Sequence, residues 1–167
     1  MMIRPMQRVA EVLDVPKPMI GMVHLPPLPG APRYEGERMA DIADFAVSEA
    51  AKLQEAGLNG MIMENFGDAM FYKRARPETI ASMTYVAKAI RDNVDLPMGI
   101  CVLQSDPIAA LSIAHVVEAE FVRVPYYTET YIVDAGVMES CAADALRFRR
   151  LLGSDALIFA DVHIKHG

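Results

Sequence analysis

Short apolar segments alternate with segments of helical spacing along the whole sequence. The apolar segments are rich in Met, Ile, Val and Leu and are bounded by Gly, Pro or Asn, which is typical of buried strands. We predict five strands, at residues 18–25, 60–65, 96–103, 120–124 and 155–165. Between them, apolar residues recur every three or four positions, as in Met39, Ile42 and Ala46. We predict four helices, at residues 38–56 and 78–91, from Pro107 onward, and at 138–152.

The predicted strands are apolar at successive positions rather than at alternate ones. Such strands are buried on both faces, and strands of this kind joined by helices form a parallel sheet that the helices cover. A doubly wound sheet and a (β/α)₈ barrel both fit this order. The sequence has no GxGxxG after the first predicted strand and no GxxxxGKS/T, so a nucleotide-binding sheet lacks its usual signature.

Polar residues stand near the carboxyl ends of the predicted strands, which favours the barrel. They are His24, Glu64, Asn65, Gln104 and Arg123. Barrel enzymes assemble their active sites on this face. We therefore predict an α/β fold of the (β/α)₈ TIM-barrel type, of which residues 1–167 form one partial domain with the first five strands and four helices.

Composition and charge narrow the classes of partner. The 167 residues are 53% hydrophobic and 23% charged, with a net charge of −6, which disfavours binding to nucleic acid or to an anionic membrane. No apolar run reaches the roughly 20 residues that cross a bilayer, and the first residues lack the apolar core of a signal peptide. Cys101 and Cys141 lie far apart in the sequence, and we interpret them as two reduced thiols in a cytoplasmic protein. We expect a cytoplasmic protein without an integral membrane segment.

The fifth predicted strand carries the strongest candidate chemistry. Asp161, His163 and Lys165 alternate with apolar residues, so the three side chains share one face of a strand. In a barrel this face points into the lumen, where ionisable groups are costly unless they pair with each other or hold a ligand. We predict a catalytic role for the three; a charge-paired inner layer is the structural alternative.

Five other residues are weaker candidates. His24 can act as an acid–base group or a metal ligand, or can be a hydrogen-bonded structural residue. Either Glu64 or Asn65, on opposite sides of the second strand, should face the lumen. Arg123 can bind a carboxylate or phosphate, or can instead form an ion pair with Glu64 or Asp161 inside the barrel. Cys101 is better interpreted as a core residue than as a nucleophile.

Three separated motifs read IGMVHLPPLPG at residues 20–30, MENFGDAMF at 63–71 and FADVHIKHG at 159–167. They resemble motifs of the BtpA family and stand in the family's order. The resemblance runs from about residue 16 to the end. It implies a TIM barrel similar to the ribulose-phosphate-binding barrels, and it favours a ligand-binding role for Asn65, Asp68 and Asp134.

The resemblance also implies that parts of the barrel lie outside this chain. A typical barrel has about 250 residues, so three βα units are expected to be absent, including those that often bind phosphate. Two motifs depart from the family pattern. Residues 101–106 read CVLQSD and residues 123–125 read RVP, where relatives carry something like NVLRND and RVN. Ligand contacts made by those Asn and Arg side chains are therefore expected to differ here.

Three functions fit these observations. The first is an enzyme on a small phosphorylated metabolite, a sugar phosphate or nucleotide, in which acid–base catalysis uses the candidates at the strand ends: His24, Glu64, Asp161, His163 and Lys165. In this reading Lys165 can also form a Schiff base. The second is a metal-assisted variant with a divalent cation on Glu64, Asp161 and His163. The third is a non-catalytic assembly factor, because the family takes its name from a factor of photosystem I biogenesis. For each we expect association into homo-oligomers.

Overall fold

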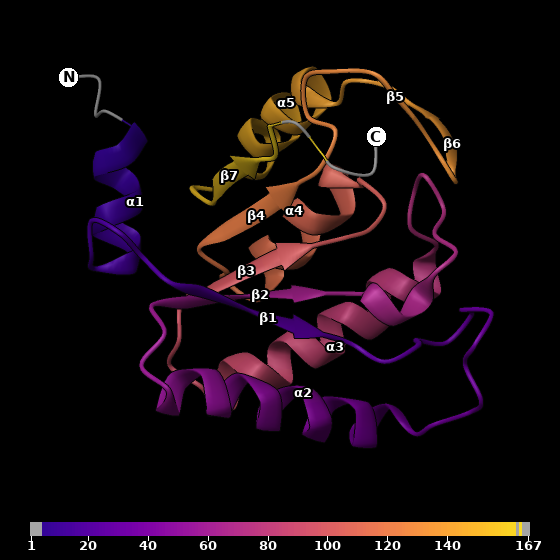
Figure 1. The fold of residues 1–167 in the computed structure, drawn as a ribbon, viewed down its shortest axis with the longest axis horizontal. Helices are drawn as coiled ribbons and strands as arrows, with labels where there is room; N and C mark the ends of the chain where they lie inside the picture. The colour runs from indigo at the N-terminus through magenta and orange to yellow at the C-terminus, as the bar shows by residue number, and fades with distance from the viewer. Residues whose placement is uncertain (1–4, 163, 165–167) are drawn as a thin grey trace.

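The computed structural model describes residues 5–162 and residue 164. Five parallel strands form one sheet in the order β1-β2-β3-β4-β7 (Figure 1). Their bounds are Ile20–His24 for β1, Gly60–Glu64 for β2, Met98–Cys101 for β3, Phe121–Val124 for β4 and Leu157–Ala160 for β7. Each predicted strand is present, so the predicted α/β class is confirmed, and the arrangement is compatible with part of a (β/α) barrel.

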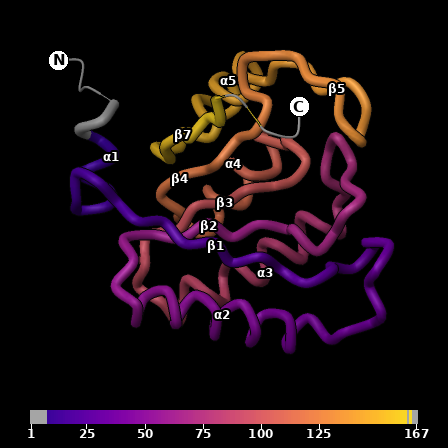
Figure 2. Tube along the Cα trace, viewed as in Figure 1, coloured from indigo at the N-terminus to yellow at the C-terminus, as the bar shows by residue number. Residues whose placement is uncertain are grey.

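Helices connect the successive strands and cover one face of the sheet, as Figure 2 shows. Their bounds are Met39–Glu55 for α2, Pro77–Asn93 for α3, Pro107–Val116 for α4 and Ala142–Leu152 for α5. The main hydrophobic core lies between these helices and the sheet. Local signals set the helix ends: the Asp106 carboxylate accepts a hydrogen bond from the Ala109 amide at 3.0 Å, and Gly153 ends α5 with a φ of 64°.

The opposite face, called here the inner face, holds a smaller core. It consists of Leu13, Ile62, Cys101, Phe121 and Leu157. Leu13 belongs to helix α1 (Pro5–Leu13), which lies beside the amino ends of the strands (Figure 1) and was not predicted. The carboxyl ends of the strands remain available for polar side chains.

Besides α1, three segments differ from the prediction. A short 3₁₀ helix, η1 (Phe66–Asp68), follows β2. A hairpin of β5 (Tyr131–Val133) and β6 (Gly136–Met138) precedes α5, so the helix predicted from residue 138 begins at Ala142. The strand β7 (Leu157–Ala160) is shorter than the strand predicted for residues 155–165. Within residues 5–162, no helix is long and apolar enough to cross a membrane.

Candidate active site at the carboxyl edge of the sheet

Arg123 joins two carboxylates that come from different strands. Its Nε and one terminal nitrogen donate to the two oxygens of Asp161 at 3.0 and 2.7 Å. Its other terminal nitrogen donates to Glu64 Oε2 at 3.0 Å. The Glu64 side chain is only 5% exposed, against 32% for Arg123 and 23% for Asp161. The ion pair predicted as an alternative for Arg123 therefore exists, with both of the named partners at once.

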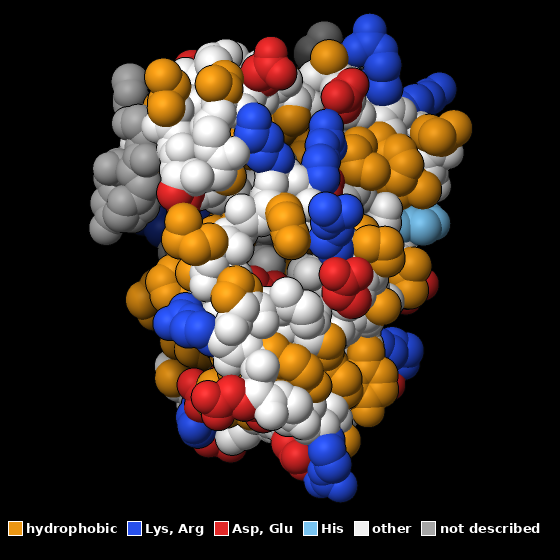
Figure 3. All heavy atoms as spheres, turned by 90° about the vertical axis from the view of Figure 1, so that its right-hand side faces the viewer, with side chains coloured by type: hydrophobic (Ala, Val, Ile, Leu, Met, Phe, Trp, Pro, Cys, Tyr) orange, Lys and Arg blue, Asp and Glu red, His pale blue; other side chains and the backbone are white. Residues whose placement is uncertain are grey.

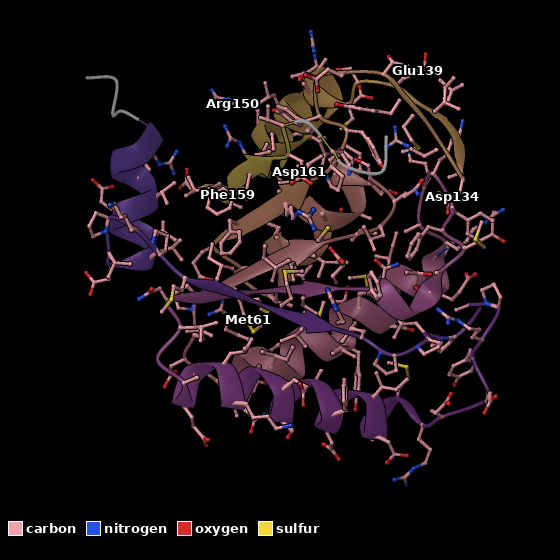
Figure 4. All side chains as sticks on the ribbon, viewed as in Figure 1. Met61, Asp134, Glu139, Arg150, Phe159 and Asp161 are labelled. Atoms are coloured by element: carbon pink, nitrogen blue, oxygen red, sulfur yellow. The ribbon has the colours of Figure 1, made fainter. Side chains whose placement is uncertain are left out.

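The strand register explains this meeting. Arg123 follows Phe121 by two residues and Glu64 follows Ile62 by two, so both side chains lie on the inner face. Glu64 is therefore the residue of the Glu64–Asn65 pair that faces the inside. The Asp161 amide donates to the Val124 carbonyl at 3.2 Å, which continues the pairing one residue past β7. Figure 4 shows Asp161 at this position.

Burial and the charges of Glu64, Arg123 and Asp161 shift the pKa values of Arg123 and of the neighbouring Cys101. Hydrogen bonding to Asp161 raises the pKa of Arg123 above its ordinary value, although burial opposes this. Burial, followed by the charge of Glu64, raises the pKa of the Cys101 thiol well above its ordinary value. A neutral, fully buried thiol is a poor nucleophile, which agrees with the interpretation of Cys101 as a core residue.

His24 stands at the edge of this charge network. Its Nε2 lies 3.6 Å from Glu64 Oε1, and its ring stacks on Phe66 with a centroid distance of 4.5 Å. About half of the His24 side chain is exposed. His24 therefore places a partly exposed imidazole beside the buried carboxylate of Glu64.

Asn65 and Asp68, both predicted to bind substrate, use their polar atoms to hold loops together. Asn65 Oδ1 accepts from the Leu103 amide at 2.8 Å, and Asn65 Nδ2 donates to Asp68 Oδ2 at 3.0 Å. Asp68 Oδ1 accepts from the Leu28 amide at 2.8 Å. The pair thus connects the loops that follow β1, β2 and β3. Both side chains are buried, so the geometry gives them a positioning role.

Burial of Asp68 leads to a prediction about pH. Burial raises the pKa of Asp68 above its ordinary value of 3.8, so the folded protein binds this proton more tightly than the unfolded chain does. The contribution of Asp68 to stability is therefore lost as the pH rises through the raised pKa and is regained toward pH 3.8. In urea denaturation, the parent should gain stability relative to Asp68→Asn as the pH falls from about 7 to about 4. A difference that stays constant with pH would contradict this expectation.

A cavity of about 810 Å³ opens beside Arg123 at the carboxyl edge of the sheet. Polar groups line one part of it and aromatic side chains another; they include Glu64, Gln104, Arg123, Asp134, Asp161, Phe66, Phe71 and Tyr126. The volume is that of a small-molecule site. The cavity brings together Glu64, Arg123, Asp134 and Asp161 of the predicted site, whereas Asn65 and Asp68 do not line it. His163 and Lys165 lie outside the described residues.

Comparison with known proteins assigns the chain to a family. The model of the BtpA family matches residues 15–167. The chain belongs to the BtpA family. The resemblance predicted from the three motifs is thereby confirmed.

Several BtpA-family relatives are similar over most of this chain. It is 50% identical over 150 residues to an uncharacterized protein of Methanocaldococcus jannaschii, a match that covers 90% of this chain and 57% of the relative. An uncharacterized protein of Pyrococcus furiosus is 46% identical over the same shares. The photosystem I biogenesis protein BtpA of Synechocystis is 43% identical, over 89% of this chain and 52% of that protein. The chain spans a little over half the length of these relatives.

In this BtpA-family chain the hairpin β5–β6 supplies one wall of the cavity. Asp134 lies in its turn (Figure 4) and accepts a hydrogen bond from the Gln104 side chain. The rings of Tyr126 and Tyr131 lie 5.2 Å apart, which fixes the base of the hairpin. Burial, followed by the charge of Asp134, raises the pKa of Tyr126, so its hydroxyl is a donor at neutral pH.

Sequence reasoning missed Tyr126, Phe66 and Phe71 as site residues. Tyr126 stands two positions after β4, where a search of every residue just past a strand end would have found it.

Among residues 5–162 and 164, no group of three His, Cys, Asp or Glu side chains is placed to hold a metal ion. Of the predicted metal set, Glu64 and Asp161 both contact Arg123, and His163 is outside the described residues.

Proposed function

We propose that this chain carries the acid–base part of an enzyme that acts on a small phosphorylated metabolite, a sugar phosphate or a nucleotide. The observation that carries the proposal is the network of Glu64, Arg123 and Asp161 on the wall of a ligand-sized cavity. The location agrees with the face on which barrel enzymes bind substrate. The reaction class is a lyase, isomerase or hydrolase that depends on proton transfer.

The charge of the network indicates which part of the ligand it contacts. Arg123 is balanced by two carboxylates, and Asp134 adds a third carboxylate to the cavity wall. These groups are hydrogen-bond acceptors, so they favour the hydroxyl groups of a sugar and repel a phosphate. The phosphate of the ligand therefore binds away from Arg123.

Within this proposal Glu64 is the proton acceptor. Its Oε2 is held by Arg123, which leaves Oε1 directed toward His24 at 3.6 Å. His24 is exposed enough to exchange the proton with solvent. Asp161 keeps Arg123 in place through two hydrogen bonds. Catalytic roles for His163 and Lys165 remain predictions from the sequence.

A ligand screen with one matched pair of variants tests the proposal. Sugar phosphates and nucleotides are screened by thermal shift on this chain and, in parallel, on the longer relative from Methanocaldococcus jannaschii. We expect Glu64→Gln to weaken binding of the best ligand by about tenfold or more, because a charged acceptor is lost. Glu120→Gln is the control, since Glu120 pairs with Arg91 at 2.8 Å and does not line the cavity.

Two results would reject the enzyme proposal. One is a panel in which no ligand stabilises either protein; the other is binding that Glu64→Gln leaves unchanged. The assembly-factor alternative draws on the name of the Synechocystis relative, and these results would favour it. An assembly factor should also tolerate neutral residues in the cavity, because its partner would contact the outer surface instead.

A further inference from the structure

Three cationic side chains gather in the loop between η1 and α3. Lys73, Arg74 and Arg76 are all exposed and fall within four residues of a chain whose net charge is −6. Figure 3 shows the face that contains this loop, with several Lys and Arg side chains close together. Such a concentration of one sign in an acidic protein creates a local positive potential.

The loop surrounds a hollow of about 540 Å³. It is lined by residues 71–77 and by Ala135 from the turn of the hairpin. The Arg76 guanidinium lies over the Tyr72 ring at 4.8 Å from its centroid, which holds this cation in place. Lys73 lies against the hairpin, since its Nζ is 3.5 Å from where a Cβ on Gly136 would stand.

The positive charge of the hollow is only partly balanced. Arg74 approaches Asp106 at 3.5 Å and Asp144 at 3.9 Å. Among the described residues, no carboxylate lies within ion-pair distance of Lys73 or Arg76. The described residues that line the hollow include no Asp or Glu. The hollow therefore favours an anionic group.

The backbone of the loop is anchored independently of any ligand. The Ala75 amide donates to Asp106 Oδ2 at 2.9 Å, and the Tyr72 carbonyl accepts from the Gln104 amide at 3.3 Å. Gln104 also holds Asp134, so the same residue connects the loop to the hairpin. Preorganised cations lose less conformational entropy when they bind an anion.

We infer that this hollow binds the phosphoryl group of the metabolite, a step that rests on the proposed function. The hollow adjoins the cavity beside Arg123: Phe71 lines both, and the neighbouring residues Asp134 and Ala135 line one each. A ligand that spans the two would place its hydroxyls on the carboxylates and its phosphate on Lys73 and Arg76. This chain then contributes a phosphate contact of its own, besides any made by further barrel units.

The size of the feature favours a small ligand over a nucleic acid. A hollow of this volume matches a small-molecule site. A nucleic-acid footprint needs basic residues along a face or groove, and the overall negative charge opposes one.

Binding of inorganic pyrophosphate, measured by calorimetry on the full chain, tests this inference. We expect Lys73→Gln/Arg76→Gln to weaken pyrophosphate binding by about tenfold or more, because two charge-assisted contacts are lost. The control is Arg38→Gln/Lys88→Gln, which removes the same charge from exposed positions outside the hollow and should change binding less than about twofold. Circular dichroism establishes that both variants are folded.

Three outcomes would overturn the inference. They are the absence of pyrophosphate binding, equal weakening in both double variants, and displacement of pyrophosphate by a single-stranded RNA at lower concentration than by any phosphate ester. Glu64→Gln separates this inference from the proposed function. If a metabolite binds in a Glu64-dependent way but pyrophosphate does not, only the inference fails. If pyrophosphate binds through Lys73 and Arg76 but no metabolite responds to Glu64→Gln, only the proposed function fails.

Discussion

An Arg123→Met variant is expected to lose about 3 kcal/mol of unfolding free energy and the ability to bind the metabolite. The substitution keeps an unbranched apolar stem but removes the guanidinium group, which leaves Glu64 and Asp161 near each other without a cation. Glu64 is almost fully buried, so water cannot replace the lost hydrogen bond at low cost. Urea denaturation at neutral pH measures the loss.

Two companion variants separate charge from packing. In Arg123→Met/Glu64→Gln/Asp161→Asn the carboxylates are also neutral, and we expect this variant to recover part of the stability, because removal of a whole ionic group costs less than removal of one partner. Arg91→Met is the matched control at the other end of the sheet, where Glu120 is more exposed. It should leave ligand binding unchanged. If the single and triple variants are equally unstable, the lost packing of Arg123 explains the effect and the charge argument is wrong.

The parallel sheet could be predicted because its determinants are local and periodic. Residues 60–64, for example, are apolar up to Glu64, and every one of them is buried in β2. The helix predicted from Pro107 and the helix end predicted at residue 152 are likewise present, with Asp106 as the N-cap of α4 and Gly153 as the C-cap of α5. The position of the site at the carboxyl edge could be predicted as well, because parallel strands bring their carboxyl ends to one side of the sheet. The sequence therefore predicts that His24, Glu64 and Arg123 stand at the same edge of the sheet.

The contacts within the site depended on features that no local pattern encodes. The two partners of Arg123 stand 59 and 38 residues away, so the sequence offered Glu64 and Asp161 only as alternatives. Ligand binding by Asn65 and Asp68 stays a prediction from the family resemblance; no local pattern indicated that their polar atoms also bind backbone amides and each other. The hairpin was missed because its strands have three residues each, too few for a periodic signal.

The second large effect is expected at Gly99, below the site. A Cβ at this position would stand 2.1 Å from Phe121 Cε2, and Phe121 is fully buried and stacked on Phe159 at 4.6 Å. The buried, stacked ring would have to shift to accept the methyl group, so Gly99→Ala should cost about 3 kcal/mol of unfolding free energy. Because Arg123 follows Phe121 by two residues, a displaced ring should also weaken ligand binding. Gly153→Ala, whose Cβ meets open space at a φ of 64°, should cost only about 1 kcal/mol.

A double-mutant cycle with Phe121→Leu identifies the cause. Leucine lacks the ring atoms that crowd Gly99, so the cost of Gly99→Ala should be smaller in the Phe121→Leu background than in the parent. Additive costs would mean that the backbone of β3, and not the ring, rejects the methyl group. A smaller cost in the Leu background would show that the aromatic pair Phe121–Phe159 is packed against bare backbone at Gly99. In that case the packing of Phe121 and Phe159 on Gly99 holds β4 in position below Arg123. The geometry of the charge network then depends on a glycine that is not part of the site.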